Sequence, residues 1–303
     1  MDQEQQTLNP PKHVGLAANP DKTAAGAVAG ELITAFLQAG IKVSMDEKTA
    51  KIAVAVSDEV ETVPGGIAEL APLVDMIVVL GGDGTMLGAV RELGDIGTPV
   101  VGINLGRLGF LTSAPSGGAE TLVSALVAGE YSLSQRSLVS ARVKRAGRAA
   151  DTVLTGLNEA VISRGSISRI INLETYVNGL FLNRFHADGL IIATPTGSTA
   201  YSLSAGGPLV SPAAGVFLVT PICPHALANR SFVVADTSEV EIRREDRADE
   251  IILSLDGQTM TPVHAGDVVV VTKAPYTVPL VMLHEHTLYE VLQKKLHWHG
   301  SSV

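Results

Sequence analysis

The first 135 residues alternate short apolar runs with helical stretches. His13–Ala18 and Asp75–Leu80 are apolar runs without polar alternation, which is typical of parallel strands buried on both faces. An Ala-rich stretch that ends at Gly40 predicts a helix, and Pro99–Asn104 predicts a further strand. Because strands alternate with helices, we expect residues 1–135 to form a doubly wound, Rossmann-like α/β domain.

The pattern changes beyond that domain. Ser137–Arg145 alternates apolar and polar residues, as strands with one buried face do. Asn178-Gly179 and Asp256-Gly257 each lie between two such runs, and these pairs favour the type I′ turn of a β-hairpin. We therefore expect residues 136–278 to form a β-rich, sandwich-like domain. Residues 279–303 contain a helical pattern and are predicted to pack back on the α/β domain.

Composition and charge exclude several classes of protein. Hydrophobic residues make up 46% of the chain and charged residues 17%, which supports a large core. The net charge of −9 argues against a general nucleic-acid binder. No apolar run reaches the roughly 18 residues of a membrane helix, and the first residues lack the features of a secretion signal. With Cys223 as the only cysteine, we expect a cytoplasmic protein without membrane or nucleic-acid partners.

A glycine-rich loop, Gly81-Gly82-Asp83-Gly84-Thr85, directly follows one predicted strand and precedes a helical run. Loops at the carboxyl ends of parallel strands are favoured ligand sites, and glycines let the backbone approach a phosphate closely. A carboxylate in such a loop indicates a proton acceptor or a magnesium ligand. The alternative is a tight turn in which Asp83 only caps the helix. Neither a Walker A loop nor a Rossmann fingerprint is present.

Three further segments have compositions that suit a ligand. Gly102–Phe110 carries three glycines in nine positions, and Leu157–Glu159 offers an amide and a carboxylate that can hydrogen-bond ribose hydroxyls. Asp188–Pro208 leads from an apolar strand into a stretch dense in Thr, Ser and Gly, where Tyr201 could pack against a base. The structural alternatives are a flexible connection, polar residues at a strand end and a polar surface loop.

The order of these motifs resembles the NAD kinase family over nearly the whole chain, from about residue 12. Thr220–His225 and Asp256–Gln258 continue the match, and Asp188–Pro208 is close to diagnostic. The resemblance implies phosphorylation of the 2′-hydroxyl of the adenosine ribose of NAD, giving NADP. It also implies ATP or inorganic polyphosphate as donor, a divalent metal ion, Mg²⁺ first among them, and a homodimer or homotetramer whose site is completed at the subunit interface.

The same resemblance implies roles for individual residues. Asp83 would accept the proton, with Gly84 beside it, and Asn158 and Glu159 would hold the adenosine ribose. Asp188 would lie near the nicotinamide end. The remaining positions that would contact the dinucleotide are Arg169, His186, Thr199, Ala200, Tyr201, Ser202, Leu203, Ser204 and Gln258. His186 stands where the family frequently has an Arg, and a neutral imidazole holds pyrophosphate less strongly than a guanidinium does.

Two other functions compete with this interpretation. A lipid kinase shares the Gly81–Thr85 motif but would need an apolar acceptor pocket, whereas Thr196–Ser204 is polar. A non-catalytic dinucleotide sensor would be favoured if Asp83 were missing, and it is present. No resident metal cluster is predicted, because the histidines near the carboxyl terminus are interpreted as surface residues; these are His284, His286, His297 and His299.

Overall fold

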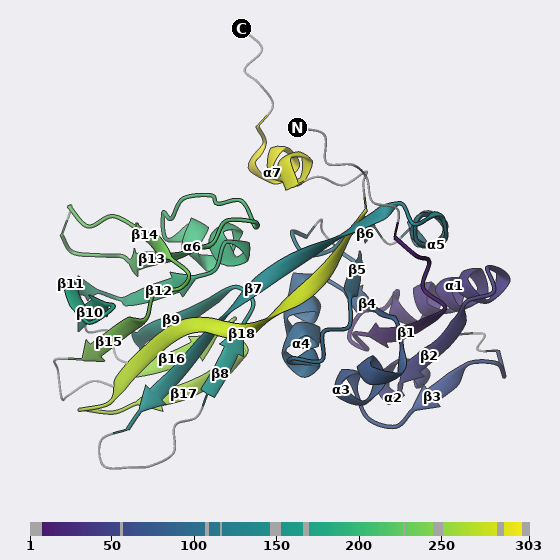
Figure 1. The fold of residues 1–303 in the computed structure, drawn as a ribbon, viewed down its shortest axis with the longest axis horizontal. Helices are drawn as coiled ribbons and strands as arrows, with labels where there is room; N and C mark the ends of the chain where they lie inside the picture. Colours follow the sequence, from purple (N-terminus) through teal and green to yellow (C-terminus); the bar gives the residue numbers. More distant parts are fainter. Residues whose placement is uncertain are drawn as a thin grey trace, which may run out of the picture. The chain divides into compact units, whose positions relative to one another are not determined.

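The computed structural model divides the chain into two compact units (Figure 1). It describes residues 8–54, 57–106, 109–115, 117–145, 153–165, 170–226, 228–244, 251–283 and 288–298. The first unit comprises residues 1–135 and 278–303, and the second comprises residues 136–277. Two long strands, β7 (Tyr131–Lys144) and β18 (Val268–Leu283), contribute residues to both units.

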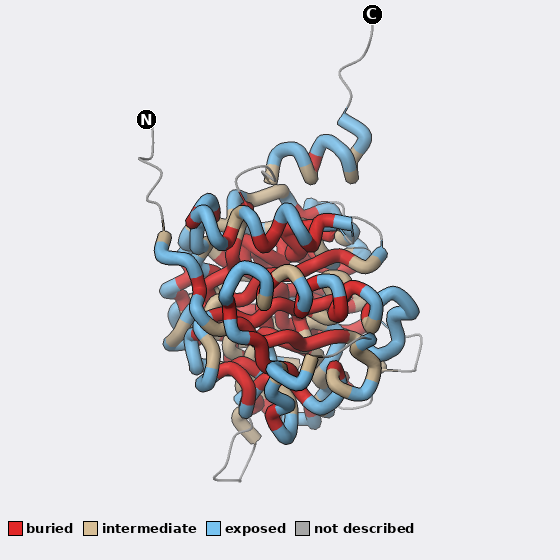
Figure 2. Tube along the Cα trace, turned by 90° about the vertical axis from the view of Figure 1, so that its right-hand side faces the viewer, coloured by how far each residue is buried: buried red, intermediate tan, exposed pale blue. Residues whose placement is uncertain are grey.

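The first unit is built on a parallel sheet in the order β3-β2-β1-β4-β5, which the end of β18 extends. Its strands are the most buried part of the unit (Figure 2). The bounds are β1 (His13–Ala18), β2 (Lys42–Asp46), β3 (Glu61–Val63), β4 (Met76–Gly81) and β5 (Val100–Asn104), with the short β6 (Ala114–Pro115) paired to β5. The apolar runs without alternation are therefore confirmed as buried parallel strands.

Helices cover both faces of this sheet. Helices α1 (Ala25–Gln38) and α5 (Ala119–Ala128) pack on the face that carries Val78 and Leu80 of β4. The other face packs closely against α4 (Asp83–Leu93) and α3 (Ile67–Leu70). A Cβ at Gly102 would lie 2.8 Å from Met86 Sδ of α4, so any larger residue there would force the Met86 side chain to shift. The remaining helices are α2 (Glu47–Ala50), η1 (Ala71–Leu73) and α7 (Leu288–Leu296). The doubly wound α/β prediction is confirmed.

The end of α1 shows how local sequence sets an element's boundary. Gly40 has φ of +74°, a left-handed conformation that glycine adopts without strain. The N–H of Ile41 donates to Phe36 O at 2.9 Å and that of Gly40 to Leu37 O at 3.0 Å, which together form a Schellman motif. The predicted helix stop at Gly40 is confirmed.

The strand order creates a switch point between β1 and β4, because the chain leaves these neighbours toward opposite sides of the sheet. Ligands of open α/β sheets bind outside the carboxyl ends of strands at such a point. Asn19 follows β1 there and the Gly81–Thr85 loop follows β4. Asn19 Nδ2 donates to Thr85 Oγ1 at 3.2 Å, which ties the two segments together.

The second unit is a β-sandwich of two sheets, as predicted. One sheet is antiparallel in the order β14-β13-β12-β9-β16-β17, and the other contains β11, β10, β15, β7, β8 and part of β18. The bounds are β8 (Val153–Gly156), β9 (Glu159–Arg164), β10 (Ile171–Val177), β11 (Leu180–Ala187), β12 (Gly189–Ala193), β13 (Val216–Ile222), β14 (Phe232–Ala235), β15 (Val240–Arg244), β16 (Ile251–Leu255) and β17 (Thr259–Val263). One core joins both sheets, with Phe217 and Leu253 from the first and Leu173 and Val271 from the second.

Both predicted hairpin turns are present. Asn178 and Gly179 have φ of 51° and 77°, and Asp256 and Gly257 have φ of 52° and 65°, as a type I′ turn requires. The strand predicted over Ser137–Arg145 begins earlier, at Tyr131, because the Tyr131 side chain is buried in the core of the first unit. Among the described residues, every helix is too short or too polar to span a lipid bilayer.

Candidate functional site

Asp83 is at the start of α4, and its carboxylate accepts hydrogen bonds from the backbone of another segment. Its Oδ2 accepts the N–H of Phe110 and its Oδ1 that of Leu111, each at 3.0 Å. Lys295 Nζ lies 3.9 Å from Oδ2. Asp83 is the first residue of the helix and Gly82 is the N-cap, so the predicted alternative of Asp83 as the N-cap is wrong. The carboxylate is partly exposed, with 32% of the side chain accessible, and can reach a ligand.

The glycines of the Gly81–Thr85 loop differ in whether the surrounding protein requires a residue without a side chain. At Gly81 a Cβ would overlap the Thr85 hydroxyl, so packing requires glycine there. Gly82 and Gly84 face no described atom within 4 Å of such a Cβ, and neither has a positive φ. Because the described protein itself does not require glycine at these two positions, they leave space for a ligand to approach the backbone.

A cavity of about 190 Å³ opens beside this loop at the switch point. Asn19, Thr85 and Gly88 line it together with Lys48. This volume is smaller than a site for a whole nucleotide. The cavity lies between the carboxyl ends of β1 and β4.

In the second unit, Asp256 organises the Leu157–Glu159 segment. Its carboxylate accepts three backbone N–H groups, from Leu157 at 2.7 Å, Asn158 at 2.8 Å and Glu159 at 3.0 Å. In return the N–H of Asp256 donates to Glu159 O at 3.0 Å. The sequence identifies Asp256 as a turn residue and as part of the family motif Asp256–Gln258, but it does not predict this clamp, because the partners of Asp256 lie nearly 100 positions away. This clamp sets the position of both predicted ribose-binding residues.

Glu159 is buried without a partner for one of its oxygens. The residue is only 6% exposed, and Oε2 has no hydrogen-bond partner in the described part of the chain. Burial, with a smaller contribution from the charge of Asp256, raises the pKa of Glu159 to about 8. A buried acceptor that lacks a donor is costly, and a ligand that donates to it recovers that cost.

The segment from Thr194 to Ser204 closes over the Asn158 backbone. Thr194 Oγ1 donates to Leu157 O at 2.6 Å, the N–H of Thr194 donates to Asn158 O at 2.8 Å, and a Cβ at Gly197 would overlap Asn158 O. The buried Arg136 donates to Thr196 Oγ1 at 3.4 Å, and burial lowers its pKa to about 10, so it stays charged at neutral pH. This buried cation carries no recognisable motif in the sequence.

Several hydroxyls of this segment bond within the protein rather than facing outward. Ser202 Oγ lies 3.1 Å from Thr220 Oγ1 in the core, and Thr199 Oγ1 donates to Thr196 O. The polar composition therefore has a partly structural cause, although these hydroxyls bond to other protein groups and do not form the polar surface loop that was the predicted alternative. Tyr201 is 44% exposed and Ser204 is exposed, so their side chains remain accessible to a ligand; Ala200 and Leu203 are partly buried and Gln258 is exposed.

His186 and Asp188 belong to a second group of predicted residues. Asp188 Oδ2 pairs with Arg164 Nη2 at 3.2 Å, and the exposed His186 lies two residues earlier, in β11. Arg164 ends β9, whereas Glu159 begins it. The five steps of about 3.3 Å between the first and last residues of β9 place the two ends about 16 Å apart, so the predicted residues of this unit form two separate groups.

Arg169, the remaining predicted residue, lies outside the described residues, as do His284, His286 and His299. Among the residues that are described, no group of three His, Cys, Asp or Glu side chains could hold a metal ion by itself.

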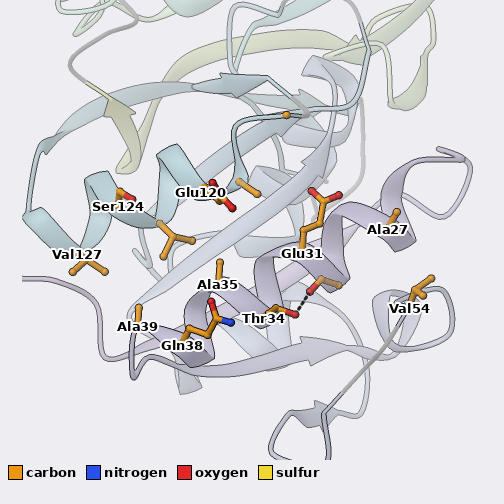
Figure 3. A pocket seen from close by; sticks show the side chains of 14 residues that line it. Ala27, Glu31, Thr34, Ala35, Gln38, Ala39, Val54, Glu120, Ser124 and Val127 are labelled. Carbon is orange, nitrogen blue, oxygen red and sulfur yellow. Dashed lines mark hydrogen bonds between the residues drawn. The ribbon is translucent and has the colours of Figure 1, made fainter.

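A larger groove of about 950 Å³ lies between α1 and α5, away from the Gly81–Thr85 loop (Figure 3). Its lining includes the acidic side chains Glu31 and Glu120 and contains no Lys, Arg or His. A groove with this charge would repel phosphates, so it is not a candidate for the phosphate site.

Two family models match the chain: the ATP-NAD kinase N-terminal domain over residues 14–131 and the ATP-NAD kinase C-terminal domain over residues 157–283. An NAD kinase of Syntrophotalea carbinolica is 40% identical over 287 residues, which are 95% of this chain and 99% of the relative. An NAD kinase of Symbiobacterium thermophilum is 49% identical over 223 residues, or 74% of this chain and 78% of the relative.

Two solved structures are also similar. Yeast NADH kinase complexed with NADH has a TM-score of 0.86 at 27% identity, covering 97% of this chain and 89% of that chain. An NAD kinase from Archaeoglobus fulgidus in complex with ATP has a TM-score of 0.71 at 24% identity, covering 94% and 98%, and supports the fold alone.

We predict that Asp256→Asn lowers the free energy of unfolding by about 2–4 kcal/mol, because an amide group replaces an oxygen that accepts backbone N–H groups. Asn tolerates the left-handed conformation of the turn, so the substitution tests the carboxylate alone. Urea unfolding measures the change. Asn178→Asp, at the other hairpin turn, is the matched control and should change the stability by less than about 1 kcal/mol. Equal effects of the two substitutions would contradict the clamp.

Proposed function

The chain belongs to the NAD kinase family, and on this basis we propose that it transfers the terminal phosphoryl group of ATP to the 2′-hydroxyl of the adenosine ribose of NAD, giving NADP. The observation that carries the proposal is the buried Glu159 carboxylate, whose Oε2 has no partner among the described residues. A ribose diol supplies neighbouring O–H donors, which such an oxygen needs.

Asp83 is the proposed proton acceptor. A carboxylate is ordinarily a weak base, and the transition state of phosphoryl transfer is loose, so most of the rate comes from positioning. The N–H groups of Phe110 and Leu111 fix the orientation of the carboxylate, and each oxygen keeps a further lone pair. Asp83 then orients the attacking hydroxyl and takes its proton late in the transfer.

Asn158 and Glu159 are the proposed ribose-binding residues. The Asp256 clamp and the Thr194 hydrogen bond hold their backbone from two sides, so the free protein already has the binding geometry. Preorganisation of this kind reduces the entropy lost on binding. Tyr201 is proposed to contact the adenine, because its exposed ring is accessible to a ligand.

The donor set in the glycine loop fits a magnesium ion that arrives with ATP. Among the described residues this loop offers one carboxylate, Asp83, and magnesium in phosphotransfer sites is usually held by one or two carboxylates together with substrate phosphates and waters. When bound, the ion offsets charge on the transferred phosphoryl group. The proposed contribution of the chain is therefore the Asp83 carboxylate.

His186 and Asp188 are proposed to contact the nicotinamide end of NAD. Asp188 pairs with Arg164, which lies about 16 Å from Glu159 at the other end of β9. This separation exceeds the reach of a single ribose and suits either the far end of an extended dinucleotide or a second copy of the chain. We infer a homo-oligomer in which this second group completes the site of a neighbouring subunit.

Formation of NADP tests the proposal and identifies the donor. Purified protein is incubated with NAD and Mg²⁺, and with either ATP or inorganic polyphosphate, with parallel samples in which EDTA removes the metal. We expect NADP with ATP and none with EDTA. NADP from polyphosphate alone would contradict the proposed donor. NAD binding without any product would favour a sensor, and phosphorylation of a lipid instead of NAD would favour a lipid kinase.

We predict that Asp83→Asn lowers kcat by about 10²–10⁴-fold with little change in the KM for NAD, because an amide cannot accept the proton. Steady-state kinetics and thermal unfolding are measured together, so that lost activity is separated from lost folding. Asp95→Asn, an exposed carboxylate beyond the end of the same helix, is the control and should retain normal activity. An Asp83→Asn enzyme within threefold of the parent would exclude this role.

The raised pKa of Glu159 predicts a pH dependence of stability for the ligand-free protein. Below about pH 4.5 Glu159 is protonated in both the folded and the unfolded protein, so its full contribution to the free energy of unfolding is present. Between about pH 4.5 and 8 Glu159 loses its proton in the unfolded chain but keeps it in the folded protein, so the free energy of unfolding falls as the pH rises. Glu159→Gln should lack this fall and exceed the parent by about 2–4 kcal/mol at pH 9, as measured by urea unfolding at pH 5, 7 and 9. The half-buried Glu239→Gln serves as control. A parallel decline in Glu159→Gln and the parent would show that Glu159 is not the cause.

A further inference from the structure

The carboxyl-terminal helix α7 brings a cation to the glycine loop. Lys295 Nζ lies 3.9 Å from Asp83 Oδ2 and 4.3 Å from the centroid of the Phe110 ring. The N–H of Phe110 itself donates to Asp83, so the ammonium, the ring and the carboxylate form one cluster at the start of α4. Among the described residues, no other cation makes an ion pair with Asp83.

The ion pair between Lys295 and Asp83 is too weak to contribute much to the stability of the fold. Its length exceeds the roughly 2.7–2.9 Å of a strong charge-assisted hydrogen bond. The two side chains are 30% and 32% exposed, and exposed ion pairs contribute little to folding. An ammonium group carries three donors, so Lys295 retains donors for an acceptor of higher charge than Asp83.

Helix α7 is only lightly anchored to the rest of its unit. Of its nine residues only Leu292 is buried, and the others are exposed or intermediate (Figure 2). Lys294 and Lys295 occupy its last turn, where cations are favoured by the helix dipole. A helix held in this way can adjust when a ligand binds to the loop beneath its lysine.

A cation at this point would lower the electrostatic cost of bringing a phosphate to the loop, in addition to the charge that a magnesium ion offsets. The protein carries a net charge of −9, and a terminal phosphate beside Asp83 would add further negative charge next to an acidic side chain. A positive group positioned where charge accumulates on the transferred phosphoryl group accelerates the transfer. Lys48 lines the cavity beside this loop, but Lys295 is the lysine whose ammonium group lies within 4 Å of the Asp83 carboxylate.

We propose that Lys295 is a catalytic residue that binds the terminal phosphate of the donor, an inference that rests on the proposed kinase function. In the transfer, the 2′-oxygen forms a bond to the terminal phosphorus as the bond from phosphorus to the bridging oxygen of ATP breaks. The hydroxyl proton passes to Asp83. Lys295 keeps its proton and donates hydrogen bonds to the phosphoryl oxygens throughout.

The test compares Lys295→Ala, Lys295→Arg and Lys294→Ala in the full-length protein. Lys294 is the neighbouring exposed lysine and serves as the matched control. Initial rates are measured with MgATP varied at saturating NAD and with NAD varied at saturating MgATP, and thermal unfolding confirms that each variant is folded. We expect Lys295→Ala to lower kcat/KM for ATP on the order of 100-fold while the KM for NAD stays within twofold. Lys295→Arg should recover part of the loss, and Lys294→Ala should behave as the parent.

Three results would overturn the assignment of Lys295. These are a Lys295→Ala enzyme within threefold of the parent for ATP, a loss that appears only in the KM for NAD, or an increase in rate, which would identify an inhibitory contact. Failure of the kinase function itself is distinguishable, because the parent protein would then form no NADP from ATP. That outcome would overturn both proposals.

Discussion

The cost of taking a carboxylate out of water shapes both units of this protein. A buried carboxylate persists only where hydrogen-bond donors replace the lost water. Asp256 and Asp83 are only partly buried, and they accept three and two backbone N–H groups, respectively, in place of the water they lose. Glu159 does not meet this condition, because its Oε2 has no partner among the described residues. Asp256 and Asp83 therefore organise the backbone around them, whereas Glu159 can still accept hydrogen bonds from a ligand.

This difference connects stability with function. The raised pKa of Glu159 reflects the free-energy cost of a charged carboxylate in a buried position of the free protein. Hydrogen bonds from bound ribose hydroxyls would reduce that cost. The Asp256 clamp keeps that cost from being relieved by a local backbone shift, because Leu157, Asn158 and Glu159 are each tied to the same carboxylate. In the first unit, a Cβ at Gly82 or Gly84 would meet no described atom within 4 Å, and the proposed phosphate site makes use of this space.

The parts of the fold that depend on local pattern could be predicted from the sequence. Apolar runs without alternation gave β1 and β4, the Asx-Gly pairs gave both hairpin turns, and Gly40 marked the end of α1. Each follows from the conformational preferences of a few adjacent residues. The early start of β7 at Tyr131 was not predictable in this way, because it depends on where a single side chain is buried.

The candidate site was predictable only in its local motifs. The roles of Asp256 and Lys295 depend on partners 99 and 212 positions away in the chain, Leu157 and Asp83, and no local pattern records them. The hydroxyls of Thr199 and Ser202 show the opposite case, because a composition that suits a ligand is partly explained by bonds within the protein. Whether a polar side chain serves the fold or a ligand is decided by its tertiary neighbours.

With its raised pKa, the Glu159 carboxyl is largely protonated in the free protein at pH 7, and it would become charged when NAD binds to it. Calorimetric titration of NAD at pH 7, repeated in buffers of different ionisation enthalpy, counts the protons that binding releases. With a pKa of about 8 in the free protein, the account predicts release of about one proton per NAD, and none from Glu159→Gln. A binding enthalpy that is the same in every buffer, or proton release that persists in Glu159→Gln, would contradict it.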